Sequence, residues 1–306
     1  MPLKTLKTDN DEELTLEWIL HVKNYKLALN KDFCVGCQIC TLACPKEAIK
    51  YKKQPKETGE KAKPAKIDIA LEKCNFCGIC DILCPYGAIK VTINGEHLLS
   101  VLEKESFPSL IRDIQVDESK CSTECAEYEE VCPLDLINIT WATAGRATES
   151  LPKDGKEKAN AKIEIERERC PCCRVCEFKF PKDTIRVRKI FHGKIKINQE
   201  RCPEDCTDCL DVCPITGALY LSDEDKKVHA NELFCVYCGA CKIVCPVEEA
   251  LQVKRTWIRH TPVSSGAWNK ALERIASPVE ITKELKAKGS QKAKESVEKR
   301  LGWKVT

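Results

Sequence analysis

The chain has 306 residues, a net charge of +3 and 23 cysteines, but only 7 Phe, 5 Trp and 1 Met. So few large apolar residues argue against a large aliphatic core, and the near balance of charges gives no attraction toward nucleic acid or an anionic membrane. No run approaches the roughly 18 apolar residues of a membrane span, and the N-terminal MPLKTLKTDNDEEL lacks a signal peptide's apolar segment, so we expect a cytoplasmic chain without a disulfide framework.

An N-terminal extension with one short amphipathic piece, ELTLEWILHV, precedes a repeated pattern. Six segments alternate apolar and polar residues, as half-buried strands do, and a cysteine follows the end of each by five residues. These segments end at Leu29, Ile69, Val116, Ile165, Ile197 and Ala230. A cysteine-rich loop, an X-Pro step and a short closing strand follow each segment; the closing strands are AIKY, AIKV, LINI, TIRV, ALYL and ALQV.

The cysteine spacing indicates what the loops bind. The loops CVGCQICTLACP, CNFCGICDILCP and CVYCGACKIVCP share a C-x2-C-x2-C-x3-C-P run, and CPEDCTDCLDVCP has one more residue after its first cysteine. Disulfides need an oxidising compartment, and zinc sites show separated CxxC pairs. Four-cysteine runs that end in Cys-Pro favour iron–sulfur clusters, which would take the place of the missing aliphatic core.

These loops resemble those of bacterial two-cluster ferredoxins, and the resemblance covers about residues 26–255 in three tandem pairs. It implies an α+β fold of three tandem bacterial-ferredoxin-like domains, with clusters as the core and a helical C-terminal tail. The expected boundaries are 1–25 for the N-terminal extension, 26–95 for domain 1, 96–112 for a linker, 113–190 for domain 2, 191–255 for domain 3 and 256–306 for a helical docking tail.

In that family the fourth cysteine of each loop ligates the cluster of the partner loop. The resemblance therefore implies five [4Fe-4S] clusters with crossed ligand sets. The sets are Cys34, Cys37, Cys40 and Cys84; Cys74, Cys77, Cys80 and Cys44; Cys170, Cys173, Cys176 and Cys132; Cys202, Cys206, Cys209 and Cys245; and Cys235, Cys238, Cys241 and Cys213.

The middle pair departs from this pattern at two positions. Tyr128 and Phe180 stand where a third and a fourth cysteine would be, and crossed ligation assigns both losses to one site. That degenerate site keeps only Cys121 and Cys125, so we predict that it is vacant and that the two aromatic rings fill its volume. Cys172 is left over and should point away from it. Three roles stay open for these thiols: no ligand role, a modified cluster or zinc, or a Cys121–Cys125 disulfide.

The C-terminal segment contains no cysteine and suggests two or three short helices, which either dock on a partner or form a loosely packed tail. A capping box begins at Ser277, and Gly289 and Gly302 look like helix ends. No nucleophile–base pair and no phosphate-binding glycine loop stand out. We therefore expect an electron-transfer subunit rather than an enzyme in its own right.

A multi-pair ferredoxin with such a tail resembles the polyferredoxin subunit of archaeal formylmethanofuran dehydrogenase, which usually carries four pairs. The resemblance implies a wire for low-potential electrons that serves CO2 reduction on methanofuran in methanogenesis, or its reverse, with the tungsten or molybdenum site on other subunits. Expected partners are catalytic and other iron–sulfur subunits and a soluble ferredoxin or another donor. Alternatives are the polyferredoxin of a hydrogenase or heterodisulfide reductase complex, or an enzyme with its own cluster-borne active site.

Overall fold

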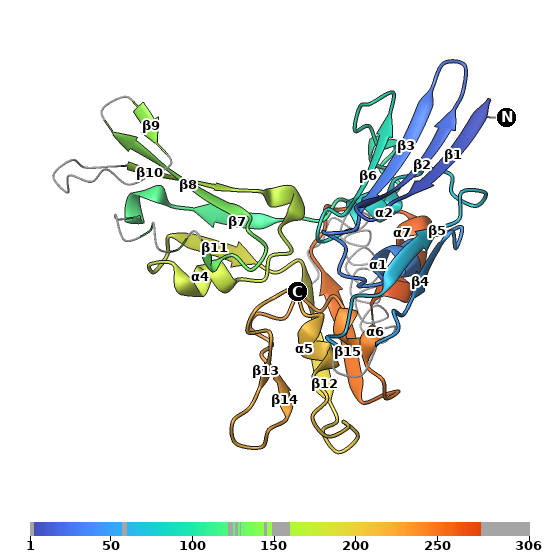
Figure 1. The fold of residues 1–306 in the computed structure, drawn as a ribbon. Helices are drawn as coiled ribbons and strands as arrows, with labels where there is room; N and C mark the ends of the chain where they lie inside the picture. Colours follow the sequence, from blue (N-terminus) through green and yellow to red (C-terminus); the bar gives the residue numbers. More distant parts are fainter. Residues whose placement is uncertain are drawn as a thin grey trace, which may run out of the picture.

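A computed structural model of the chain describes residues 3–56, 60–121, 125, 128, 130–143, 146–148 and 160–276. Three arms extend from a common centre, and each arm contains one pair of repeated units (Figure 1). The same antiparallel pairing recurs in every arm: the first strand of the pair lies beside the last, and the two middle strands lie beside each other.

In the first arm, β3 (Asn24–Asn30) pairs with β6 (Ile89–Ile93), and β4 (Ile49–Lys52) pairs with β5 (Lys66–Ile69). Two short helices, α1 (Ile39–Ala43) and α2 (Ile79–Ile82), follow the cysteine loops. Each helix carries the third cysteine of its loop inward, because Cys40 and Cys80 are both buried.

The N-terminal residues enlarge the sheet of this first arm. Strands β1 (Lys4–Asp9) and β2 (Glu13–Ile19) form a hairpin, and β2 pairs with β3, which gives the order β1-β2-β3-β6. Strand alternation buries Leu14 and Leu16 on one face, and the Trp18 ring lies 5.0 Å from that of Phe76. The amphipathic piece of the expected extension 1–25 is thus a strand within the first ferredoxin-like sheet, not a separate segment.

The second arm follows the same plan. Its outer pairing joins β7 (Asp113–Val116) to β11 (Ile185–Arg188), and its inner pairing joins β8 (Ile137–Thr143) to β10 (Asn160–Ile165). A third strand extends the inner pairing, and short helices flank the cysteine loops. These elements are β9 (Arg146–Thr148), the 3-10 turns η1 (Glu118–Lys120) and η3 (Arg167–Arg169), and α4 (Val175–Lys179).

In the third arm, β12 (Phe191–Ile197) pairs with β15 (Leu251–Ile258), and β13 (Leu219–Leu221) pairs with β14 (Val228–Ala230). Its helices are α5 (Asp208–Asp211) and α6 (Ala240–Val244). All the repeated segments predicted as strands therefore lie in strands, shifted by at most about one residue, and the chain is a mixed α/β protein.

The segments outside the repeats pack on the repeats. The linker contains α3 (Ser100–Glu103), and its end pairs with the residues after β15, since the Ile111 N–H donates to the Arg259 carbonyl oxygen at 3.0 Å. The tail begins with α7 (Gly266–Ile275), where the Trp268 ring lies 5.9 Å from that of Phe107. The start of the tail therefore docks on its own chain.

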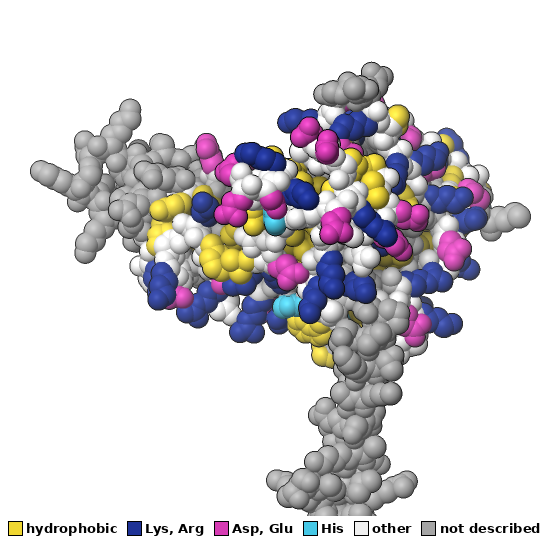
Figure 2. Space-filling view, turned by 90° about the horizontal axis from the view of Figure 1, so that it is seen from below, with side chains coloured by type: hydrophobic (Ala, Val, Ile, Leu, Met, Phe, Trp, Pro, Cys, Tyr) yellow, Lys and Arg dark blue, Asp and Glu magenta, His cyan; other side chains and the backbone are white. Residues whose placement is uncertain are grey.

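The remaining tail features, namely the capping box at Ser277 and the helix ends at Gly289 and Gly302, lie outside the described residues. Within the described part of the chain, no helix is long and apolar enough to cross a membrane. Acidic and basic side chains are interspersed over the face that Figure 2 shows, in keeping with the near-zero net charge.

Candidate iron–sulfur cluster sites

The structure gathers the cysteines into crossed groups. Cys34, Cys37 and Cys40 come from one loop, Cys84 comes from the partner loop, and all four line one cavity. In the reciprocal group, Cys44 lines a cavity with Cys74, Cys77 and Cys80. We call each group by its first cysteine, hence the Cys34 site and the Cys74 site.

The other two arms repeat the crossing. The Cys170 site is a cavity lined by Cys170, Cys173, Cys176 and Cys132. The Cys235 site is a cavity lined by Cys235, Cys238, Cys241 and Cys213. In the Cys202 site, the thiol of Cys245 lies close enough to interact electrostatically with Cys202 and Cys209, and these thiols are only partly buried.

Four of the cysteine loops share a backbone geometry that orients their thiols. Four of the short helices begin after a residue in the left-handed conformation: Gln38, Gly78, Arg174 and Gly239. Behind the fourth cysteine, a backbone N–H turns back onto sulfur: that of Ala48 lies 3.4 Å from Cys44 Sγ, and that of Ala88 lies 3.3 Å from Cys84 Sγ. Such N–H groups orient a thiolate ligand and stabilise its charge.

The grouped, buried thiols of these cavities favour the binding of a positively charged group. Burial, and to a smaller extent the charge of neighbouring thiols, raises the pKa of Cys34 and Cys74 to about 11 and that of Cys173 and Cys213 to about 12. Four such thiols cannot all ionise at neutral pH without a compensating positive charge. Iron supplies that charge, because metal ligation requires the thiolate form and releases the proton.

The distances between the cysteine sulfur atoms distinguish a cluster site from a site for a single metal ion. Zinc needs four sulfurs at about 2.3 Å from one centre, which brings them into mutual contact. Among the described residues, no three His, Cys, Asp or Glu side chains are placed to hold one metal ion. The cysteines instead surround cavities, which fits a polynuclear iron–sulfur cluster with a thiolate at each corner.

In the degenerate site of the second arm, two aromatic rings and a disulfide stand in place of four free cysteines. The Tyr128 and Phe180 rings lie 5.3 Å apart, and Phe180 is buried. Cys121 and Cys125 are joined by a disulfide. The two aromatic rings therefore contact each other, and Cys121 and Cys125 form the disulfide that was one of their three open roles. That the site holds no cluster stays a prediction.

Cys172 belongs to the neighbouring Cys170 site. Its side chain is buried, and its Sγ lies 3.9 Å from the carbonyl oxygen of Cys170. A hydrogen bond from the Cys172 thiol lowers the pKa of Cys170, so Cys172 assists ionisation of a predicted ligand.

Replacing both Cys121 and Cys125 with serine should leave the iron content of the reconstituted chain unchanged, because a disulfide offers no thiolate to iron. Iron measured by plasma mass spectrometry against the parent checks this. The matched control, Cys170→Ser with Cys173→Ser, should lose about four irons. A loss of iron or zinc from the Cys121/Cys125 variant would contradict the disulfide assignment.

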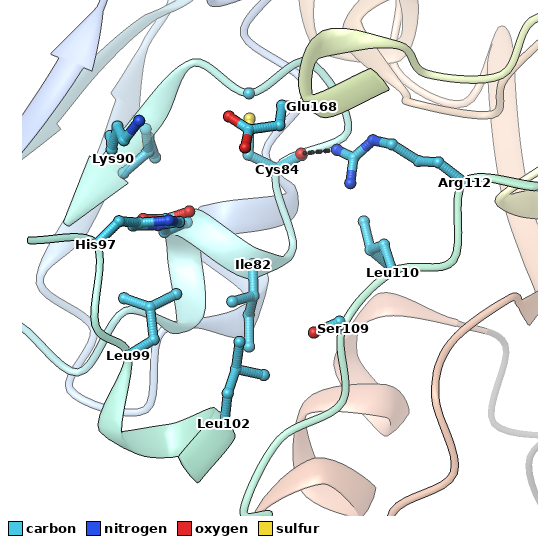
Figure 3. A pocket seen from close by; sticks show the side chains of 13 residues that line it. Ile82, Cys84, Lys90, His97, Leu99, Leu102, Ser109, Leu110, Arg112 and Glu168 are labelled. Atoms are coloured by element: carbon cyan, nitrogen blue, oxygen red, sulfur yellow. Dashed lines mark hydrogen bonds and ion pairs between the residues drawn. The ribbon is translucent and has the colours of Figure 1, made fainter. Parts of the chain in front are cut away.

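A further cavity, of about 180 Å³ and open to solvent, lies beside the Cys34 site (Figure 3). Leu99 and Leu102 from the linker and Ile82 line one side, and Arg112 lies across from them. The dashed line in Figure 3 marks the hydrogen bond from Arg112 to the carbonyl oxygen of Cys84, 3.0 Å long. The backbone of Cys84, a predicted cluster ligand, is thus held by a cation from the linker.

Sequence reasoning missed three such cations: Arg112, Lys189 and Arg255. For Arg255 a signal existed, because Leu251, Val253 and Arg255 are every second residue of β15 and so share its inward face. A charged residue at an inward position of a strand marks a special contact. Arg112 lies just before β7 and Lys189 just after β11, so strand alternation gives no such signal for them.

The comparisons with known proteins agree with this geometry. Residues 33–88 and residues 194–246 each match a family described as a 4Fe-4S dicluster domain. An aliphatic sulfonate oxidoreductase, polyferredoxin-like subunit, of Pyrococcus furiosus is 34% identical over 96 residues, which are 28% of this chain and 53% of that protein. The chain thus spans about half the length of this curated relative.

A solved structure resembles nearly the whole chain. It is a chain of the formate dehydrogenase–heterodisulfide reductase–formylmethanofuran dehydrogenase complex from Methanospirillum hungatei. The two chains are 30% identical, with a TM-score of 0.77, and the match covers 90% of this chain and 92% of that one.

Crossed four-cysteine cavities on repeated strand–loop–strand units define an iron–sulfur electron-transfer protein of the 4Fe-4S dicluster ferredoxin type. The chain carries more than one such pair and is similar to a polyferredoxin-like subunit.

Proposed function

We propose that the chain is an electron-transfer subunit that carries five [4Fe-4S] clusters in three tandem ferredoxin-like domains and serves formylmethanofuran dehydrogenase. The observation that carries the proposal is the match, over nine tenths of both chains, to a chain of a complex that contains this enzyme. When bound, the clusters would supply one-electron chemistry at low potential. The protein's own part is to hold them in order and to exclude water.

The five proposed ligand sets are the Cys34, Cys74, Cys170, Cys202 and Cys235 sites. Four of them are supported by cavities that crossed cysteines line, and the Cys202 site by the proximity of Cys245. Within the described residues nothing resembles a substrate site with a nucleophile and a base. Catalysis therefore belongs to the partner subunits, and a soluble ferredoxin or another donor would deliver the electrons.

Anaerobic reconstitution of the full chain should give about 20 iron atoms and as many acid-labile sulfides, because each complete set holds four irons. Iron and sulfide assays on the folded monomer check the count. A value near 24 would mean that the degenerate site also holds a cluster, and a value near 16 would mean that one of the five sets fails.

The partner is tested by purifying the tagged chain from its native source under anaerobic conditions and identifying co-purified subunits by mass spectrometry. Formylmethanofuran dehydrogenase subunits are the expected result. A hydrogenase or heterodisulfide reductase without them would select the second candidate, for which the heterodisulfide reductase in the same solved complex is the specific observation. Substrate turnover by the chain alone would instead support a cluster-borne active site.

A further inference from the structure

The three arms meet where three cluster sites lie closest to the centre. Arg112 extends from the linker between two cysteine loops of different arms. Its Nη2 donates to the carbonyl oxygen of Cys84 at 3.0 Å, and its Nε donates to that of Cys170 at 3.2 Å (Figure 3 shows the first). One guanidinium therefore joins the Cys34 site of the first arm to the Cys170 site of the second.

The backbones of these two arms are also in close contact. A Cβ on Gly87 would come within 2.9 Å of the Glu168 carbonyl oxygen, so only glycine fits there. The Arg169 guanidinium stacks over the Phe33 ring at 3.4 Å from its centroid. Phe33 precedes Cys34 and Arg169 precedes Cys170, so both contacts hold the two cysteine loops against each other.

Arg255 joins the first arm to the third. Its Nε donates to the carbonyl oxygen of Tyr237 at 2.8 Å and its Nη2 to that of Cys238, and its charge interacts with the thiols of Cys37 and Cys238. At 7% exposure it is buried between the Cys34 and Cys235 sites. A Cβ on Gly239 would lie 3.2 Å from Arg255 Nη2 and 3.9 Å from the Cys37 carbonyl oxygen.

Lys189 completes the set between the second and third arms. Its Nζ donates to the carbonyl oxygen of Cys235 at 2.7 Å, and its charge interacts with the thiols of Cys235 and Cys173. The residue is 8% exposed. Each pair among the Cys34, Cys170 and Cys235 sites is thus bridged by one cation, and we call these three the inner sites.

None of these cations forms an ion pair with a carboxylate, although the charge of Glu232 acts on Lys189. No ion pair among the described residues includes Arg112, Lys189 or Arg255. A buried charge is costly unless an opposite charge compensates it. Carbonyl oxygens alone do not neutralise it, whereas four thiolates around a [4Fe-4S] core carry a net negative charge that grows on reduction.

We propose that the three inner sites form an electron junction, in which Arg112, Lys189 and Arg255 raise the reduction potentials of the two sites each one bridges, so that electrons gather at the centre before they leave along an arm. The inference rests on the proposed five clusters. Each transfer is one electron from a reduced site to its oxidised neighbour, and no bond forms or breaks. A nearby positive charge favours the reduced, more negative state, and low local dielectric strengthens the effect.

The test is a redox titration of the full reconstituted chain, followed by EPR, with iron measured on the same samples. Arg255→Met removes the charge, Arg255→Lys keeps it, and Arg188→Met on an exposed position of β11 is the matched control. Arg255→Met should lower the reduced-to-oxidised ratio of two clusters at least tenfold at a fixed potential, or 59 mV for one electron. Arg255→Lys and Arg188→Met should change it less than threefold.

The three single variants together test the proposal without any need to assign each EPR signal to a particular cluster. Arg255→Met, Lys189→Met and Arg112→Met should each move two of five signals, so that three signals move in two variants each and two signals move in none. Arg112 is half-buried beside an open cavity, so its shift should be the smallest. If Arg255→Met loses iron, Arg255→Gln, which keeps hydrogen-bond donors, takes its place.

Two failures are distinguishable. Parent protein with far fewer than about 20 irons would contradict the proposed cluster count. Full iron with no shift in any variant, or with equal shifts of all signals, would overturn the junction and leave the proposed function standing.

Discussion

Replacing Cys84 with alanine should remove about four irons, and they should be lost from the loop of Cys34, Cys37 and Cys40 rather than from the loop to which Cys84 belongs. The reason is geometric, since Cys84 lines the same cavity as those three thiols. Iron content gives the size of the loss. Alkylation of the folded, anaerobic protein followed by peptide mass spectrometry locates it, because thiols without a cluster become reactive.

The reciprocal variant is the matched control. Cys44→Ala should expose Cys74, Cys77 and Cys80 to alkylation and leave the Cys34 loop protected, because Cys44 lines their cavity. If each variant instead exposes the loop in which the substitution lies, the crossed ligand sets of the first arm are wrong.

The second large effect is a gain of iron. Tyr128→Cys together with Phe180→Cys should raise the iron content by about four, because the pair restores the ligand set with Cys121 and Cys125. Either substitution alone leaves three thiolates at most, so the two should act non-additively. The disulfide between Cys121 and Cys125 must be reduced first, so reconstitution is carried out in excess dithiothreitol. Iron assay and EPR of the reduced protein give the result.

A control variant distinguishes the effect of the added thiolates from the effect of the opened volume. Tyr128→Ser together with Phe180→Ser opens a similar volume and supplies no thiolate, so it should gain no iron. An unchanged iron count in a folded double-cysteine variant would mean that the surroundings no longer support a cluster. The middle arm would then have lost more than its two cysteines.

Local features of the sequence predicted much of the fold and of the candidate sites. Strand alternation and the fixed spacing to the first cysteine located the repeated strands, because both depend only on neighbouring residues. The coupled change at Tyr128 and Phe180 was also readable, since ring contact follows from crossed ligation. Whether the gathered cysteines bind iron as proposed stays a prediction until iron is measured.

The arrangement of the arms could not be read in this way. The cysteine spacing predicts each pair of units but not the contact of Gly87 with Glu168 or of Arg255 with the Cys34 site, which depend on residues far apart in the chain. The hairpin of β1 and β2 was missed for a related reason. ELTLEWI has a strand's alternation, but its partner strand is set by tertiary packing rather than by the segment itself.

The Tyr128–Phe180 pair has a consequence for the whole chain viewed as a circuit. On the proposed count and junction, the Cys74 site of the first arm and the Cys202 site of the third arm would be the two ends of the electron path. The second arm would end at the Cys170 site, because two aromatic rings contact each other where its second cluster would be. A cluster on such a side branch would carry no net flow of electrons. It would hold one electron while another passes between the two ends, and so act as a one-electron store.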